Sequence, residues 1–256
     1  MKTNQSYRQL RDANLADFIK ETLIKRHFSK FDNPKFEYRS GAVSGSNKDL
    51  DALLCLNAEK SDRSFDGTKF AQAHPNEEFY CRGMGKNYKR KINAYDIRWT
   101  DYLIIKRVLN TLNLTENDVF YDLGSGLGRM IISAAIITPA VCKGIEFIPE
   151  RIEQAIKAKQ RLALDNLHLI CGNVLDQDFS DGTAFYMWEP FSNDTQMKVI
   201  KELEKISKNK QITIAAKGCT RYFFGMFEKQ SWLKIKHNWG DWQCKNGQAV
   251  EFYTSI

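Results

Sequence analysis

The cysteine and histidine patterns that mark a metal site or a disulfide framework are missing from this sequence. The six cysteines are scattered, with no C-x-x-C pair and no histidine at ligand spacing, whereas zinc ligands come in close pairs. Cys142 and Cys171 lie inside apolar runs, so we expect both to be small buried side chains. These absences exclude a structural zinc site and predict reduced thiols with no bound metal.

A long hydrophobic run is also missing. No stretch reaches the ~18 apolar residues that a membrane helix needs, and residues 1–8 lack the apolar core of a secretory signal. With 43% hydrophobic and 27% charged residues, the composition is typical of a folded globular chain and not of a disordered one. We expect a cytoplasmic protein without membrane contact. Its 256 residues can form one large α/β domain plus an extension, or two small domains.

Acidic residues are in deficit only in the front half of the chain. The net charge is +7, and residues 1–110 hold 21 Lys and Arg against 14 Asp and Glu, whereas residues 111–256 hold 17 against 17. A positive field confined to one part of the chain predicts that this part meets an acidic surface on a macromolecular partner. The alternative is a solvated basic surface without a partner.

Residues 1–94 are expected to form a basic N-terminal extension that serves substrate recognition. Apolar residues recur at helical spacing over 8–27, and a second helix is expected over 49–56. Residues 60–95 are polar, aperiodic and interrupted by glycine. Helical spacing returns over 99–112, near the start of the second expected domain, which spans residues 95–256.

From residue 119 onward, short apolar runs alternate with helical patterns. Strands are expected over 119–123, 141–145, 167–171, 184–188 and 211–216, with helices over 129–138, 150–164 and 195–207 between them. Strands separated by helices of this length form βαβ units with a mostly parallel sheet. Residues 233–237 and 250–254 are expected to add an antiparallel hairpin. The fold class is therefore α/β.

The glycine-rich stretch from Asp122 to Arg129 follows the first of these strands and opens a helix. Gly124, Gly126 and Gly128 allow a ligand to approach the backbone closely, which a Cβ would prevent. Arg129 stands where a dinucleotide fingerprint has its last glycine. A ligand with an amino-acid end needs an acceptor for its ammonium group as well as N–H donors for its carboxylate, and Asp122 is such an acceptor.

Further motifs follow the next expected strands: Glu146 and Phe147 after 141–145, Asn173 and Val174 after 167–171, and Glu189, Pro190 and Phe191 after 184–188. In this order, these motifs and the glycine-rich stretch resemble those of the class I S-adenosylmethionine-dependent methyltransferases, whose Rossmann-like sheet would cover residues 95–256. The resemblance implies S-adenosylmethionine as cofactor, with Glu146 holding the ribose hydroxyls and Asn173 accepting from the adenine amine. The family usually has Asp where this chain has Asn173. The implied cofactor-binding residues are Asp122, Gly124, Ser125, Gly126, Gly128, Glu146, Phe147, Asn173 and Val174.

Two of these assigned residues, and three other residues that the sequence singles out, also have a purely structural interpretation. Phe147 can fill the core as well as line an adenine pocket, because aromatic side chains mostly fill cores. Asn173 can be a turn residue, and Arg129 can be an ordinary surface residue of its helix. Trp239 and Trp242 are more simply explained by packing than by a substrate cage.

Glu189, Pro190 and Phe191 end the fourth strand, where this family places its substrate-facing motif. Methyl transfer to an amine requires a deprotonated nucleophile, and a carboxylate near the methyl group can orient the amine and accept its hydrogens. Glu189 is therefore the candidate acceptor, and Glu189, Pro190 and Phe191 together are the candidate catalytic residues. The alternative is that Glu189 caps the helix that begins near Asp194.

Within the family, the phrase from Phe120 to Arg129 and the basic extension are most similar to the non-SET lysine methyltransferases. Those enzymes have an Asn, or a short Asn/Asp-Pro-Phe/Tyr phrase, where this chain has Glu189. The resemblance implies N-methylation of lysine on a protein. RNA is the rival substrate, because residues 82–91 combine positive charge, glycine and an aromatic. A non-catalytic cofactor-binding protein is the second alternative.

Overall fold

The computed structural model describes residues 50–54, 56, 100–218, 221–239 and 249–256, together with Asp17 and Glu21. Both single residues are helical, as are residues 50–53, so the helices expected around them hold at these positions. The basic residues 82–91 and Trp242 lie outside the described residues.

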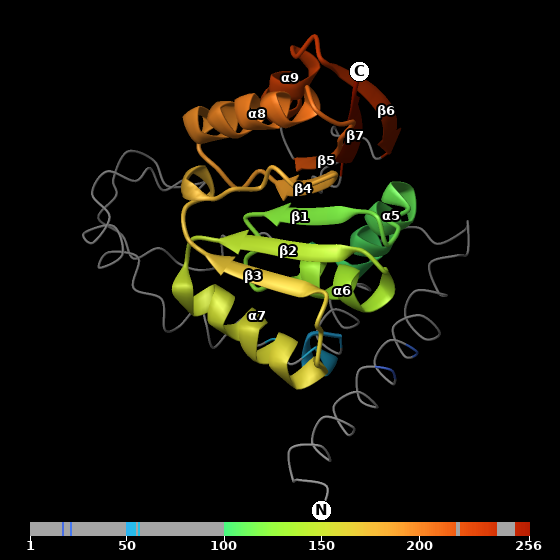
Figure 1. The fold of residues 1–256 in the computed structure, drawn as a ribbon, viewed down its shortest axis with the longest axis vertical. Helices are drawn as coiled ribbons and strands as arrows, with labels where there is room; N and C mark the ends of the chain where they lie inside the picture. Colours follow the sequence, from blue (N-terminus) through green and yellow to red (C-terminus); the bar gives the residue numbers. More distant parts are fainter. Residues whose placement is uncertain are drawn as a thin grey trace, which may run out of the picture.

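Seven strands and six helices make up the described part of the chain from residue 100 onward (Figure 1). The strands are β1 (Val119–Leu123), β2 (Val141–Glu146), β3 (Leu167–Cys171), β4 (Ala184–Trp188), β5 (Thr213–Gly218), β6 (Leu233–Trp239) and β7 (Ala249–Ser255). The helices are α5 (Tyr102–Leu112), α6 (Arg129–Ile137), α7 (Pro149–Leu162), α8 (Asn193–Ser207), α9 (Arg221–Glu228) and the short 3-10 turn η4 (Val174–Asp176).

The strands form one sheet in the order β3-β2-β1-β4-β5-β7-β6. Strands β1 to β5 run parallel to one another, whereas β7 is antiparallel to both β5 and β6. The expected parallel sheet and antiparallel hairpin are confirmed. Within the hairpin, β7 is the interior strand next to β5, and β6 is the edge strand of the sheet. The strand order reverses between β1 and β4, so the carboxyl ends of these two strands flank the crevice in which open α/β sheets bind ligands.

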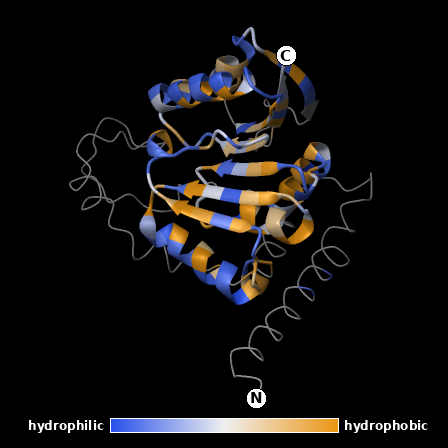
Figure 2. Cartoon of the chain, viewed as in Figure 1, coloured by the Kyte–Doolittle hydropathy of each residue, from blue (hydrophilic) through white to orange (hydrophobic). Residues whose placement is uncertain are grey.

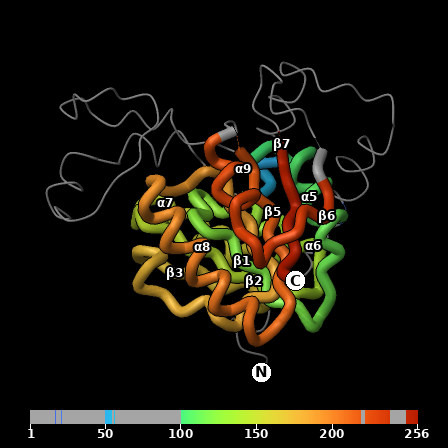
Figure 3. Tube along the Cα trace, turned by 90° about the horizontal axis from the view of Figure 1, so that it is seen from above, coloured from blue at the N-terminus to red at the C-terminus, as the bar shows by residue number. Residues whose placement is uncertain are grey.

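Helices cover both faces of the sheet, as the view from above shows (Figure 3). Buried residues of α5, α6 and α7 share a hydrophobic cluster with Phe120, Cys142 and Tyr186 of the strands. Residues of α8 and α9 pack in a second cluster with Tyr121, Phe185 and other strand neighbours. Successive strand residues alternate between the two clusters, as the two-residue period of a strand requires. Hydrophobic residues dominate α6, while α8 carries mainly hydrophilic ones (Figure 2).

Local signals mark where the helices begin and end. The side chain of Ser192 accepts a hydrogen bond from the Thr195 backbone N–H at 3.3 Å and so caps α8. Pro149 opens α7, and Ala163 ends it in a left-handed conformation. These residues set the helix boundaries within two residues of the positions that the apolar periodicity predicts.

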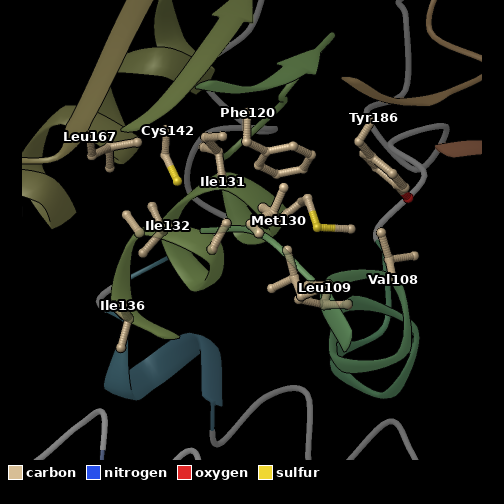
Figure 4. Packing of buried hydrophobic residues seen from close by; sticks show 14 of the residues in the cluster. Val108, Leu109, Phe120, Met130, Ile131, Ile132, Ile136, Cys142, Leu167 and Tyr186 are labelled. Carbon is tan, nitrogen blue, oxygen red and sulfur yellow. The ribbon is translucent and has the colours of Figure 1, made fainter. Parts of the chain in front are cut away.

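Leu50, Leu54 and Leu56 of the front half are buried in the same cluster as α6. Figure 4 shows the helical turn of residues 50–53 below Ile136, with the side chains of Ile131, Ile132 and Met130 directed into the cluster. Part of the front half therefore contributes to the core of the sheet domain.

Two expectations need correction. Cys142 is buried but Cys171 is exposed, because it ends the edge strand β3, where the apolar run meets solvent. The apolar run of residues 221–228 forms the helix α9, which the sequence analysis did not assign. In the described part of the chain, no helix is long and apolar enough to cross a membrane, and no group of three His, Cys, Asp or Glu side chains could hold a metal ion.

Candidate functional site

The glycine-rich turn between β1 and α6 has left-handed backbone conformations at all three glycines. Their φ angles are 85° at Gly124, 57° at Gly126 and 86° at Gly128, a region that side chains disfavour. A Cβ on Gly124 would lie 2.3 Å from the Pro190 Cβ, so β1 and the segment after β4 could not approach each other as they do. A Cβ on Gly126 would meet nothing within 4 Å. The turn therefore leaves open space above its middle glycine.

Glu146, the last residue of β2, is tied to this turn. One carboxylate oxygen accepts the Gly126 backbone N–H at 2.7 Å, and the other accepts the Ile148 backbone N–H at 2.9 Å. The side chain is buried. Since each carboxylate oxygen can accept more than one hydrogen bond, Glu146 can hold the turn and still accept from the hydroxyls of a bound ribose.

Asp122 of β1 is buried beside the turn, and no hydrogen bond to its carboxylate is present within the described residues. Burial away from water and the neighbouring Glu146 charge raise the pKa of Asp122 well above its ordinary value. An uncompensated buried carboxyl is costly unless a cation pairs with it. The nearby Ser125 hydroxyl is also buried and has no hydrogen-bond partner among the residues that the structure describes. Both groups fit a ligand that brings an ammonium and a carboxylate.

Three residues expected at the adenine and ribose have mixed positions. The Asn173 side-chain oxygen accepts the Leu175 backbone N–H at 3.0 Å and caps η4, which is the turn role considered as its alternative. Val174 is buried in the cluster of α8 and α9, so its side chain serves the core. Phe147 is only partly buried and lies directly after β2, next to Glu146. Contact of these residues with a cofactor stays a prediction.

The segment from Trp188 to Phe191 crosses the carboxyl end of β4. Glu189 has a left-handed φ of 38°, an uncommon conformation for a residue with a side chain, and one that clusters at functional sites. Glu189 and Pro190 are partly exposed, while Phe191 packs against the second cluster. Because Ser192 caps α8, the helix does not require Glu189 as its cap.

A buried lysine lies next to this segment. Lys217 of β5 is fully buried, and its Nζ lies 3.3 Å from the centroid of the Trp188 ring. Trp188 and Lys217 are also register partners in the β4–β5 ladder. A cation over an aromatic face is stabilised by ~2 kcal/mol or more when it is desolvated. Lys217 was not predicted as a site residue, although a single lysine that follows the apolar residues of β5 at the carboxyl end of the strand could have indicated one.

Arg129 is not the surface residue considered as its bland alternative. It is buried, and its guanidinium pairs with Asp51 and lies 5.1 Å from the centroid of the Tyr102 ring. No sequence signal connected Asp51 to the glycine turn, because the two positions are far apart in the chain.

The structure thus brings together Asp122, the glycine turn and Glu146 with the segment from Trp188 to Pro190. All lie at the carboxyl edge of the parallel strands, around the point where the strand order reverses. This arrangement can hold a zwitterionic, ribose-bearing ligand beside a partly exposed carboxylate.

Comparison with known proteins agrees with this arrangement. The family model described as "Histone methylation protein DOT1" matches residues 99–204, a range that contains the glycine turn, Glu146 and Glu189. A protein-lysine N-methyltransferase of Saccharolobus islandicus is 32% identical over 89 residues, which cover 33% of this chain and 54% of that protein. The chain thus spans about half the length of this curated relative.

Solved methyltransferase structures are similar to parts of the chain. An RNA methyltransferase from Salinibacter ruber, in complex with S-adenosyl-L-homocysteine, has a TM-score of 0.44 and 21% identity, covering 62% of this chain and 92% of its own. A TehB-like SAM-dependent methyltransferase from Corynebacterium glutamicum has a TM-score of 0.47 and 13% identity, covering 78% of this chain and 100% of its own.

The strand order and the glycine-rich turn show the Rossmann-like fold of the class I methyltransferases, and residues 99–204 are similar to the DOT1 family model. S-adenosylmethionine is the cofactor that the residues of this site fit, through the open space above Gly126 and the buried carboxyl of Asp122, to which no hydrogen bond is present within the described residues. Within the class, the sequence is similar to the DOT1 model and to an archaeal protein-lysine methyltransferase.

Proposed function

We propose that this protein transfers a methyl group from S-adenosylmethionine to the side-chain amine of lysine on a protein. The assignment of the cofactor is supported by the buried carboxyl of Asp122. This carboxyl has no hydrogen-bond partner in the described residues and lies beside the open glycine turn. The observation that supports the substrate is the 32% identity with a protein-lysine N-methyltransferase.

Each residue of the site has a distinct proposed role in cofactor binding. Asp122 pairs with the ammonium of the methionine part, while the Ser125 hydroxyl donates a hydrogen bond to its carboxylate. Glu146 accepts hydrogen bonds from the ribose hydroxyls. Phe147, Asn173 and Val174 are assigned to the adenine side. When bound, the cofactor supplies an electrophilic methyl group on a sulfonium.

Glu189 is the proposed acceptor for the hydrogens of the substrate amine, with Pro190 and Phe191 shaping the approach. Glu189 follows β4 directly with a left-handed φ of 38°, next to the point between β1 and β4 where the strand order reverses. An amine that donates to this carboxylate keeps its lone pair available for in-line attack, so the protein's main contribution is alignment and exclusion of water.

Residues 82–91 are proposed to meet an acidic surface of the substrate protein. Six basic residues and one acidic residue lie between Arg82 and Arg98. Attraction between such surfaces weakens as salt shortens the Debye length from about 10 Å at 0.1 M to about 3 Å at 1 M. Rising salt should therefore raise the KM for the protein substrate and leave cofactor affinity nearly unchanged.

The test is transfer of tritium from labelled S-adenosylmethionine to a whole-cell extract by the purified full chain. We expect the label to become soluble on protease treatment, to resist ribonuclease, and to be recovered as methylated lysine after acid hydrolysis. Label released by ribonuclease would favour an RNA substrate. Cofactor binding without any label transfer would favour a non-catalytic protein, and both results contradict lysine methylation.

A further inference from the structure

The contact between Asp51 and Arg129 joins the front half of the chain to the cofactor turn. The Arg129 Nε donates to Asp51 Oδ1 at 2.7 Å, and Nη2 donates to Oδ2, so the ion pair is two-pronged. The third nitrogen, Nη1, donates to the Thr100 carbonyl at 3.3 Å. The Tyr102 hydroxyl donates to Asp51 Oδ1 at 2.8 Å. All four residues are buried.

Arg129 occupies a sensitive position in the turn. It is the first residue of α6 and follows Gly128, whose backbone has a φ of 86°. The Gly128 N–H donates to the Ser125 carbonyl at 2.8 Å, and Gly126 is held by Glu146. Space around Gly128 is tight, because a Cβ there would lie 3.0 Å from Ala155. A shift of Arg129 therefore moves the glycine backbone on which the ligand would rest.

Asp51 belongs to a segment that the core also holds. This front segment, residues 50–54 and 56, buries Leu50, Leu54 and Leu56 against the cluster that includes α6. Two backbone hydrogen bonds fix its shape, from the Leu54 N–H to the Leu50 carbonyl at 2.9 Å and from the Leu56 N–H to the Asp51 carbonyl at 2.8 Å. Packing alone thus provides an anchor for the segment.

A buried ion pair is a poor device for stability alone. Desolvation of two charges offsets most of their attraction, and a well-packed hydrophobic pair of similar volume usually serves stability equally well. A two-pronged pair between arginine and carboxylate does supply fixed geometry. Burial, followed by the Asp51 charge, raises the pKa of Tyr102 well above its ordinary value, so this third member stays a neutral donor. The cluster is thus arranged for a single relative position of segment and turn.

We propose that Asp51 and Arg129 are a positioning pair, through which binding at the glycine turn and seating of the front segment favour each other. The proposal rests on the proposed function, since it takes the turn to be the cofactor site. Such coupling is reciprocal: any contact that stabilises the packed position of the segment raises the affinity for the cofactor, and cofactor binding stabilises the packed position of the segment to the same extent.

The test uses the full chain with S-adenosylhomocysteine as the probe, in native protein and in the variants Asp51→Asn and Arg129→Lys. Leu54→Val is the matched control, because it loosens the same segment without touching the ion pair. Calorimetry measures the affinity for the probe. Hydrogen exchange of the Leu54 and Leu56 amides, with and without the probe, measures seating of the segment.

We expect both pair variants to bind the probe about 10-fold more weakly, within the usual range of coupling between sites. Leu54→Val should bind nearly as the native protein does, because the loss of one methylene group loosens the segment without displacing it, and the ion pair that couples the segment to the turn is intact. The probe should slow exchange at Leu54 and Leu56 in the native protein and in Leu54→Val, but not in Asp51→Asn. Arg129→Lys retains the charge and keeps the question open to measurement if Asp51→Asn does not fold.

Pair variants that bind as tightly as the native protein, or native exchange that ignores the probe, would overturn the positioning role alone. A native protein that fails to bind the probe would instead overturn the proposed function, and with it this inference.

Discussion

The carboxyl ends of β1 and β2 and those of β4 and β5 build two different kinds of surface on the same sheet. The first, the cofactor edge, consists of Asp122, the glycine turn and Glu146, and it relies on backbone N–H groups and left-handed glycines. The second, the acceptor edge, consists of Trp188, Glu189 and Lys217, and it relies on side chains from neighbouring strands.

If the proposed function is correct, cofactor binding and chemistry divide between these two surfaces, on either side of the point where the strand order reverses. A cofactor shared by many enzymes can be held by backbone geometry, whereas a particular substrate needs side chains that vary. Changes at the cofactor edge should therefore alter cofactor affinity, and changes at the acceptor edge should alter turnover.

Gly126→Val should have the largest effect and should abolish binding of S-adenosylhomocysteine. A Cβ there would meet no atom of the described residues within 4 Å, so the valine side chain should project into the space assigned to the methionine part of the cofactor. We expect no heat in calorimetry and far-UV circular dichroism close to that of the native protein. Ala163→Val is the control, because exposed Ala163 has a similar φ of 50° far from the turn and tests the backbone strain alone. Equal loss of binding in both variants would contradict the role of the turn.

Glu189→Leu should lower kcat by about 100-fold, which is the usual contribution of a positioned proton acceptor, and should leave the affinity for S-adenosylhomocysteine unchanged. Glu189→Asn should retain more activity, because its amide oxygen still accepts a hydrogen bond and Asn tolerates a left-handed backbone. Single-turnover kinetics on the labelled substrate separates the chemical step from binding. A loss of cofactor affinity that parallels the loss of kcat would break the division between the two edges.

Asp122→Asn should weaken S-adenosylhomocysteine by about 30-fold, the lower end of the cost of truncating a buried charge pair. The same change should stabilise the ligand-free protein at neutral pH. The native pKa of Asp122 is raised by burial and by Glu146, so the folded protein holds this proton more tightly than the unfolded chain does. The contribution of Asp122 to the free energy of unfolding is then fully present below the unfolded pKa of about 3.9, and it is lost as pH rises through the native pKa.

The measurement for Asp122 is the melting temperature of ligand-free protein between pH 5 and pH 8. We expect the variant to gain on the native protein as pH rises, while its probe affinity falls. A variant less stable than the native protein at pH 8 would show that Asp122 has a structural partner.

Most of the sheet could be predicted from the sequence, since apolar runs of strand length alternate with amphipathic helices. Strands 119–123, 167–171 and 184–188 agree with β1, β3 and β4 residue for residue. The position of β7 between β5 and β6 could not be predicted, because hairpin signals do not determine which strand faces the sheet. Helix α9 was missed because its apolar residues follow β5 almost at once.

The residues of the cofactor edge could be predicted to lie together because they are close in sequence or end successive strands. The acceptor edge was only half readable: Glu189 belongs to a short phrase, but Lys217 reaches Trp188 only through the β4–β5 ladder. Arg129 and Asp51 are separated by 78 positions, and only the folded chain shows that they meet. Periodicity carries local geometry, whereas contacts between distant elements depend on topology.

The place of β7 in the sheet also bears on how the chain is made. During synthesis, β6 leaves the ribosome before β7, yet within the described sheet β7 is the strand that pairs with it. Until residues 249–255 emerge, β6 has no ladder partner, and the edge of β5 that β7 will cover stays open. Unpaired strand edges invite pairing with other chains. The newly made protein is therefore most exposed to mispairing in the interval between these two strands, after the cofactor edge has already been synthesised.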